Sequence, residues 1–203
     1  MSAIVSAVKE VMEMATATAI DVGQYVYQRK GWVNAWCLQK LVFFAHAWSL
    51  AWDGQGLFDA EVQAWPDGPV ERELYAVNKY HRDGMYGTAL SGADVSRLTP
   101  RQMAVIDAVI EHYGDWSREQ LIEASHTPVW EAARGDAGPG RHAQGSVLAT
   151  GDIRRWYTRS ALSGGDSPVP PSDHVGSVSE VSNDVVKAQI DRWRGALDLL
   201  AER

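Results

Sequence analysis

One segment, residues 34–53, constrains the fold of this chain more than any other. Its apolar side chains recur at the spacing of an α-helix, and Phe43 and Phe44 extend the apolar surface around most of the helix circumference. Asn34 is a favourable N-cap, and Gly54 follows as a favourable helix end. A helix that is apolar on nearly all sides has to be buried among other elements. We therefore expect this helix to lie at the centre of a helical domain.

Shorter helices are predicted around the central one. Apolar residues at helical spacing predict helices over 1–16 and 19–30. Two capping-box patterns, at residues 99–102 and 117–120, predict the starts of two more. A short helical turn is expected at residues 129–134, and a last helix is expected to begin with Thr150 as its N-cap.

Residues 57–65 are typical of one or two short strands, and residues 66–69 then form a turn. Pro69 suits the first position of a helix that reaches about Tyr80, with Glu71 and Glu73 near the positive end of its dipole. The predicted fold class is therefore mainly α, a compact helical domain with a small β element. A C-terminal helix follows on a linker rich in Pro, Gly and Ser.

Composition along the chain predicts four parts. These are an N-terminal helical extension (1–16), the main domain (17–160), the linker (161–180) and a C-terminal amphipathic helix (181–203). The last helix carries a narrow apolar seam: Val186, Ile190, Trp193, Leu197 and Leu200. An isolated helix of this length is marginal in water, so the seam must pack on its own domain, on a second copy or on a partner. We favour its own domain.

The charges and reactive side chains exclude several function classes. With 19 basic and 26 acidic residues the formal net charge is −7, which disfavours binding to nucleic acid phosphates. The single cysteine, Cys37, suits a reducing cytoplasm, and we expect no signal peptide and no membrane span. The six histidines lack metal-site spacing. We therefore expect no catalytic residues, no metal and no cofactor.

Nine tryptophans are more than a small core readily hides, and tryptophan is favoured as an anchor at protein interfaces. Five of them lie beside predicted turns or on the C-terminal helix: Trp32, Trp36, Trp65, Trp116 and Trp193. Most of these should cover the edges of the domain, and the rest should face a partner.

Five segments of the chain form an ordered set of motifs. They are Leu38-Gln39-Lys40-Leu41-Val42-Phe43-Phe44-Ala45 with Trp48; Leu57-Phe58 with Ala64-Trp65, Gly68-Pro69-Val70 and Tyr75; Val105–Val109 with Tyr113-Gly114; Ser117, Leu121, His126 and Trp130; and Ile153 with Trp156-Tyr157. In this order they resemble the Panacea domain of SocA-like, phage-associated antitoxins. The resemblance covers roughly residues 19–158. The chain departs from the family pattern at Pro66-Asp67 and in the short spacing from His126 to Trp130, and both places could contact a partner.

The resemblance implies a non-enzymatic antitoxin that binds a protein toxin directly, with delivery of the toxin to a Clp-type protease as the alternative and an uncharacterised enzyme as a third, less favoured one. Two residue sets follow from the resemblance together with the positions of the tryptophans and polar residues. The expected partner contacts are Trp65, Asp67, Gly68, Pro69, Val70 and Trp193. The expected structural residues are Leu38, Gln39, Lys40, His126 and Trp130, in which Gln39 and Lys40 hydrogen-bond nearby backbone or a carboxylate and His126 satisfies carbonyls at a helix end.

Overall fold

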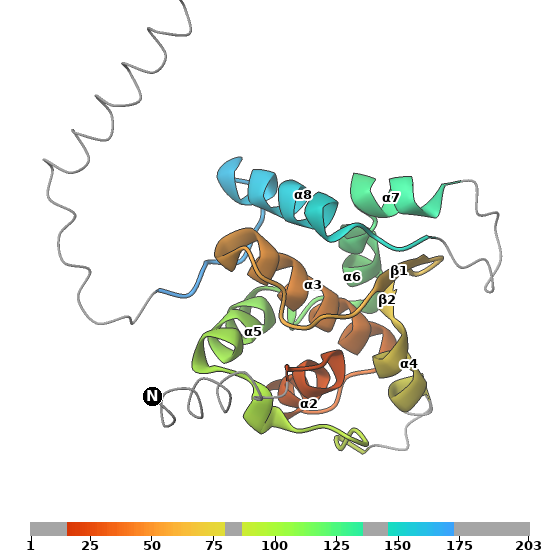
Figure 1. Ribbon diagram of the computed structural model, residues 1–203, viewed down its shortest axis with the longest axis vertical. Coiled ribbons are helices and arrows are strands. Elements are labelled where there is room, and N and C mark those ends of the chain that lie inside the picture. The colour runs from red at the N-terminus through yellow and green to blue at the C-terminus, as the bar shows by residue number, and fades with distance from the viewer. Residues whose placement is uncertain (1–15, 80–86, 136–145, 173–203) are drawn as a thin grey trace, which may run out of the picture. The chain divides into compact units, whose positions relative to one another are not determined.

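The computed structural model describes residues 16–79, 87–135 and 146–172. These residues form seven α-helices, a short 3-10 helix (Val95–Arg97) and one two-stranded antiparallel sheet (Figure 1). The mainly α class with a small β element is therefore confirmed. All these elements belong to the compact unit that ends at Pro171. Residues 1–15 of the first predicted helix, and the whole of the predicted helix 181–203, lie outside the described residues.

The first described helix, α2 (Ala19–Lys30), has the predicted bounds. Thr18 caps it, and the carboxylate of Asp21 accepts from the Thr18 backbone N–H at 2.8 Å, which completes a capping box. Gly31 ends the helix with φ 79°, a conformation that favours glycine.

The helix α3 (Ala35–Asp53) lies at the centre of the domain, as predicted (Figure 1). The Asn34 side chain accepts from the Cys37 backbone N–H at 3.0 Å, and Gly54 ends the helix in the left-handed conformation. Fourteen of its nineteen residues are buried. Contacts with α2, β2, α5, α6 and α8 cover it on nearly every side, so its apolar circumference is matched by its surroundings.

The sheet is a hairpin of β1 (Val62–Trp65) and β2 (Gly68–Glu71), in which Trp65 pairs with Gly68 and Val62 with Glu71. Residues 146–148 add a short antiparallel stretch to the other edge of β1, through Leu148 N–H to Val62 O at 2.8 Å. The helix α4 (Arg72–Asn78) follows directly.

Two predicted helix starts are wrong. Pro69 lies in β2 opposite Ala64, and α4 begins three residues later with Glu71 as its N-cap, whose carboxylate accepts from two backbone N–H groups. Thr150 is the first residue of α8 (Thr150–Leu162), and the N-cap position belongs to Ala149, which offers no capping side chain.

The remaining helices surround α3. They are α5 (Pro100–Tyr113), α6 (Arg118–Ser125) and α7 (Pro128–Arg134), and the capping boxes predicted for α5 and α6 are both present. Aromatic rings fix α3 against α5 and α8: Phe44 stacks on Tyr113 with 4.4 Å between ring centroids, and Trp48 meets Tyr157 edge-on. These ring contacts fix the orientation of α3, so that the face that carries Gln39 and Lys40 lies against the hairpin.

Candidate functional site

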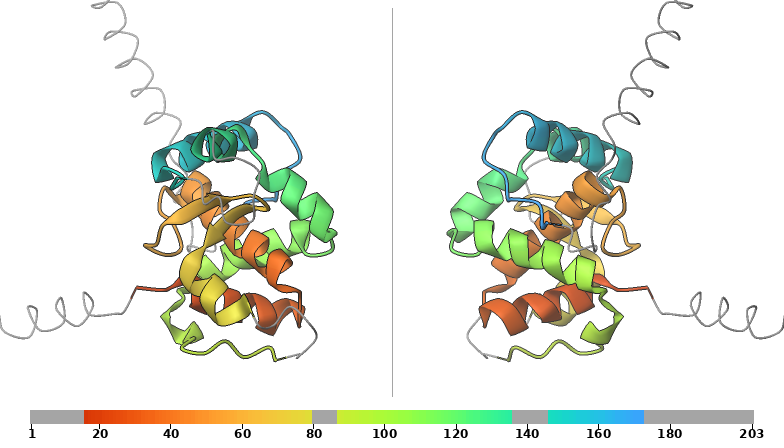
Figure 2. Two further views of the ribbon diagram at one scale, coloured as in Figure 1. Left: turned by 90° about the vertical axis from the view of Figure 1, so that its right-hand side faces the viewer. Right: turned by 90° about the vertical axis from the view of Figure 1, so that its left-hand side faces the viewer.

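Three of the segments that carry the family resemblance meet at the β1–β2 hairpin. The segments are 38–40 on α3, 64–70 in the hairpin itself and 126–130 at the start of α7. Figures 1 and 2 show the hairpin beside the amino-terminal half of α3, with α6 and α7 close by. We call the side chains that hold the hairpin backbone the clamp: Gln39, Lys40, Trp130 and Arg134.

On one side, the clamp covers the free edge of β2. The Gln39 amide donates to Glu71 O and accepts from Glu71 N–H, both at 3.2 Å, so it pairs with this residue as another strand would. Lys40 Nζ donates to Pro69 O at 2.9 Å. Pro69 itself has no N–H to satisfy. The outward backbone groups of Pro69 and Glu71 are thus all paired, and this edge cannot accept another strand.

On the other side, α7 holds β1. The indole N–H of Trp130 donates to Trp65 O at 3.0 Å, and the Arg134 guanidinium donates to Ala64 O at 3.3 Å. Arg134 is not among the residues expected from the sequence. Its position four residues after Trp130 was the available signal, because that spacing places both side chains on one helix face.

The turn of the hairpin is fixed by its close approach to α3 and α6. Gly68 has φ 98°, and a Cβ there would collide with Ser125 Oγ and lie 2.8 Å from Lys40 Nζ, so glycine is required. Asp67 accepts from the indole N–H of Trp36 at 3.2 Å, and the Arg118 guanidinium lies over that indole at 4.4 Å.

The Lys40 ammonium is the charge most affected by this packing. Only 1% of the side chain is exposed, and burial lowers the pKa of Lys40 to about 7, while the nearby Asp67 carboxylate acts in the opposite direction. The backbone hydrogen bonds expected for Gln39 and Lys40 are therefore present, and both residues are buried.

His126 differs from the expectation. Its ring stacks on Trp130 with 3.8 Å between centroids, and its Nε2 atom has no hydrogen-bond partner among the described residues. The bond at the helix end comes from its backbone N–H, which donates to Glu123 O at 3.1 Å. Burial lowers the pKa of His126, and the nearby Lys40 ammonium lowers it further. The side chain thus supports Trp130 rather than the helix carbonyls.

The predicted contact residues separate by exposure. Asp67 is exposed and Trp65 is half-buried, whereas Gly68, Pro69 and Val70 are buried. Trp193 lies outside the described residues. Trp36 and Trp130 are half-buried, and their indole N–H groups donate to the two ends of the hairpin turn, at Asp67 and at Trp65 O. We define the turn surface as Trp36, Trp65, Asp67 and Trp130.

The one cysteine of the chain, Cys37, lies in the first turn of α3. Burial raises the pKa of the Cys37 thiol, which disfavours the nucleophilic thiolate. Among the described residues, His, Cys, Asp and Glu side chains form no cluster suited to a metal ion. In the same part of the chain, no helix combines the length and the apolar character needed to cross a bilayer.

Comparison with known proteins supports the resemblance. The family model described as "Antitoxin SocA-like, Panacea domain" matches residues 38–131, which include the clamp residues Gln39, Lys40 and Trp130 and the whole hairpin. No curated protein and no solved structure matches the chain significantly. Residues 38–131 are thus similar to the Panacea domain of SocA-like antitoxins.

Proposed function

We propose that this protein is the antitoxin of a toxin–antitoxin system and neutralises a cognate protein toxin by binding it directly. The observation that carries the proposal is the family match over residues 38–131. The clamp adds a physical reason, because it holds the hairpin in one conformation before any partner arrives. A surface that is already ordered loses less conformational entropy on binding.

The turn surface supplies the expected contacts. Trp36, Trp65 and Trp130 are tryptophans of the kind that anchor protein interfaces, and Asp67 adds an exposed carboxylate beside them. The net charge of −7 favours association with a basic partner. A toxin that itself binds nucleic acid would have such a surface.

The proposal is tested by co-expression with the product of the adjacent gene. Growth should be rescued, and the two proteins should purify together. Asp67→Lys should weaken the complex by about tenfold or more, because it reverses a charge at the centre of the turn surface. Glu111→Lys is the matched control, since it reverses an exposed charge on α5 that lies outside the turn surface. If co-expression of this protein restored growth against none of the neighbouring gene products, the proposal would be refuted.

Delivery of the toxin to a Clp-type protease is the alternative mechanism. Repeating the rescue in a protease-deficient host separates the two. Direct neutralisation persists in that host and leaves the half-life of the toxin unchanged. Rescue that disappears without the protease would replace direct binding with delivery.

A further inference from the structure

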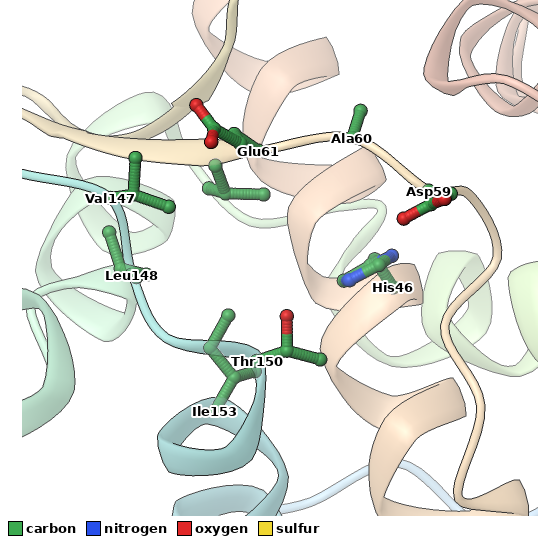
Figure 3. Close-up of a pocket in the computed structure, with 9 residues that line it drawn as sticks. His46, Asp59, Ala60, Glu61, Val147, Leu148, Thr150 and Ile153 are labelled. Atoms are coloured by element: carbon green, nitrogen blue, oxygen red, sulfur yellow. The ribbon is translucent and has the colours of Figure 1, made fainter.

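A cavity of about 170 Å³ opens beside His46 of α3, at a place that the clamp does not use (Figure 3). The segment 59–62 and the segment 147–150 form two of its sides, and Ile153 of α8 also lines it. None of the lining residues is Lys or Arg. The lining thus combines two carboxylates, from Asp59 and Glu61, with apolar side chains such as Leu148 and Ile153.

The His46 ring is held rigidly at this cavity. It stacks on Phe58 with 4.2 Å between ring centroids, and a Cβ on Gly56 would collide with it. Only 4% of the residue is exposed, yet Nδ1 has no hydrogen-bond partner among the described residues. Burial lowers the pKa of His46 to about 4, so the ring is neutral at pH 7 and one of its nitrogens is an acceptor. A buried polar group without a partner requires an explanation, and a ligand supplies one.

The charges around the cavity select the kind of ligand. Asp59 and Glu61 lie exposed on the rim and extend from the same segment (Figure 3). The amino end of α8 contributes roughly half a positive charge from Thr150, which two full carboxylates outweigh. Asp152 in the first turn of α8 offsets that end further. The rim is thus an acceptor-rich site that favours a cation.

We propose that this cavity binds an arginine side chain of the protein partner, an inference that rests on the proposed antitoxin function. The aliphatic stem packs on Val62, Val147 and Leu148. The guanidinium donates to the Asp59 carboxylate and to the neutral His46 ring. Arginine fits better than lysine, because its planar group carries five donors in fixed directions and is less strongly hydrated.

The test uses the full chain and Nα-acetyl-L-arginine amide as the probe, with the His46 ring resonances followed by NMR. We expect saturable shifts with a dissociation constant on the order of millimolar, the range of a small ligand. The citrulline analogue keeps the shape but lacks the charge, and it should bind at least about tenfold more weakly. Equal binding of the two probes, or no saturable shift with arginine, would overturn the proposal.

Variants locate the binding. The double variant Asp59→Asn with Glu61→Gln keeps the size of both side chains and should weaken arginine binding about tenfold. Glu111→Gln is the matched control, because it removes an exposed carboxylate that does not line the cavity. His46→Phe keeps a ring against Phe58 but removes the two ring nitrogens. Since this variant has no His46 resonances to follow, arginine binding to it is measured from the backbone amide resonances of Thr150 and Ile153. Unchanged affinity in the double variant would overturn the proposal.

The arginine proposal and the proposed antitoxin function can be refuted independently of each other. If no neighbouring gene product is neutralised but arginine still binds at His46, the proposed function fails while the cavity remains a guanidinium site. If the toxin is neutralised equally by the protein and by the double variant, and arginine does not bind, the cavity proposal alone fails.

Discussion

Replacement of Lys40 by methionine tests the physical basis of the clamp. The Lys40 side chain is buried, and its pKa falls from the ordinary 10.5 to about 7 because burial disfavours the ammonium. Between these two pH values the unfolded chain binds a proton at this lysine that the folded protein does not. The free energy of unfolding therefore rises with pH through this range. Below pH 7 the lysine is charged in both states, and the full cost of burying it remains.

The size of the effect follows from the shifted pKa. One pH unit in this range corresponds to about 1.4 kcal/mol, and because Lys40 is half titrated at its folded pKa, the protein should gain about 2 kcal/mol from pH 7 to pH 9. Lys40→Met removes this gain. It also leaves Pro69 O without its donor, at a cost of about 1–3 kcal/mol that does not depend on pH. The stability difference between protein and variant should thus grow by about 2 kcal/mol over this range.

Urea denaturation at pH 6, 7, 8 and 9, followed by tryptophan fluorescence, measures the difference. Lys30→Met is the control, because Lys30 is partly exposed and forms an ion pair with Asp115. It shows the pH dependence that the loss of a surface lysine brings. Parallel pH profiles for the protein and Lys40→Met would refute the argument, because they would mean that the packing of the hairpin does not perturb the ammonium.

Further predictions concern the rest of the clamp, the cap of α4 and the C-terminal segment. Trp130→Phe should lower the free energy of unfolding by about 1–2 kcal/mol in urea, because it deletes the N–H that binds Trp65 O but keeps a ring against His126; an unchanged midpoint would contradict the bond. His126→Ala should lower the Tm by about 2–4 °C through lost stacking while toxin binding persists, and a fully stable variant that no longer binds would make His126 a contact residue. Glu71→Ala should cost about 1–2 kcal/mol in thermal unfolding, because its carboxylate caps two N–H groups of α4, and a smaller loss would show that water replaces the cap. A chain ending at residue 172 should still neutralise the toxin, with a lower Tm, if residues 181–203 pack on their own domain; lost neutralisation at an unchanged Tm would assign that segment to the toxin.

The ends of α3 and the starts of α5 and α6 were predictable from the sequence, because the interactions that fix them are local. Thr99, Ser117 and Asn34 each cap a helix through the residue three positions later. Gly54 ends α3 through its own left-handed conformation. The burial of α3 was equally predictable, since a helix that is apolar around nearly its whole circumference has no polar face to turn toward water. These parts of the fold depend on residue spacing alone.

The site depended on more than spacing. The resemblance to a known family indicated Gln39, Lys40 and Trp130. The polar character of Gln39 and Lys40 on an apolar helix suggested hydrogen bonds, but nothing local indicated where those bonds lead. Arg134 was not identified at all, and Trp36 was noted only as one tryptophan near a turn. Their partners, Ala64 O and Asp67, lie 70 and 31 residues away along the chain.

Pro69 shows why only the tertiary structure could decide. Its fixed φ suits the first turn of a helix, and its missing N–H suits the edge of a sheet, so its sequence neighbourhood is consistent with either. The choice is made by α3, from which Lys40 reaches Pro69 O and Gln39 pairs with Glu71. Those bonds hold residues 68–71 extended and delay the helix to Arg72. Local spacing determines which structures a segment can adopt, and the buried donors that it meets on another helix select among them, because an unpaired buried polar group costs more than a small difference in local preference.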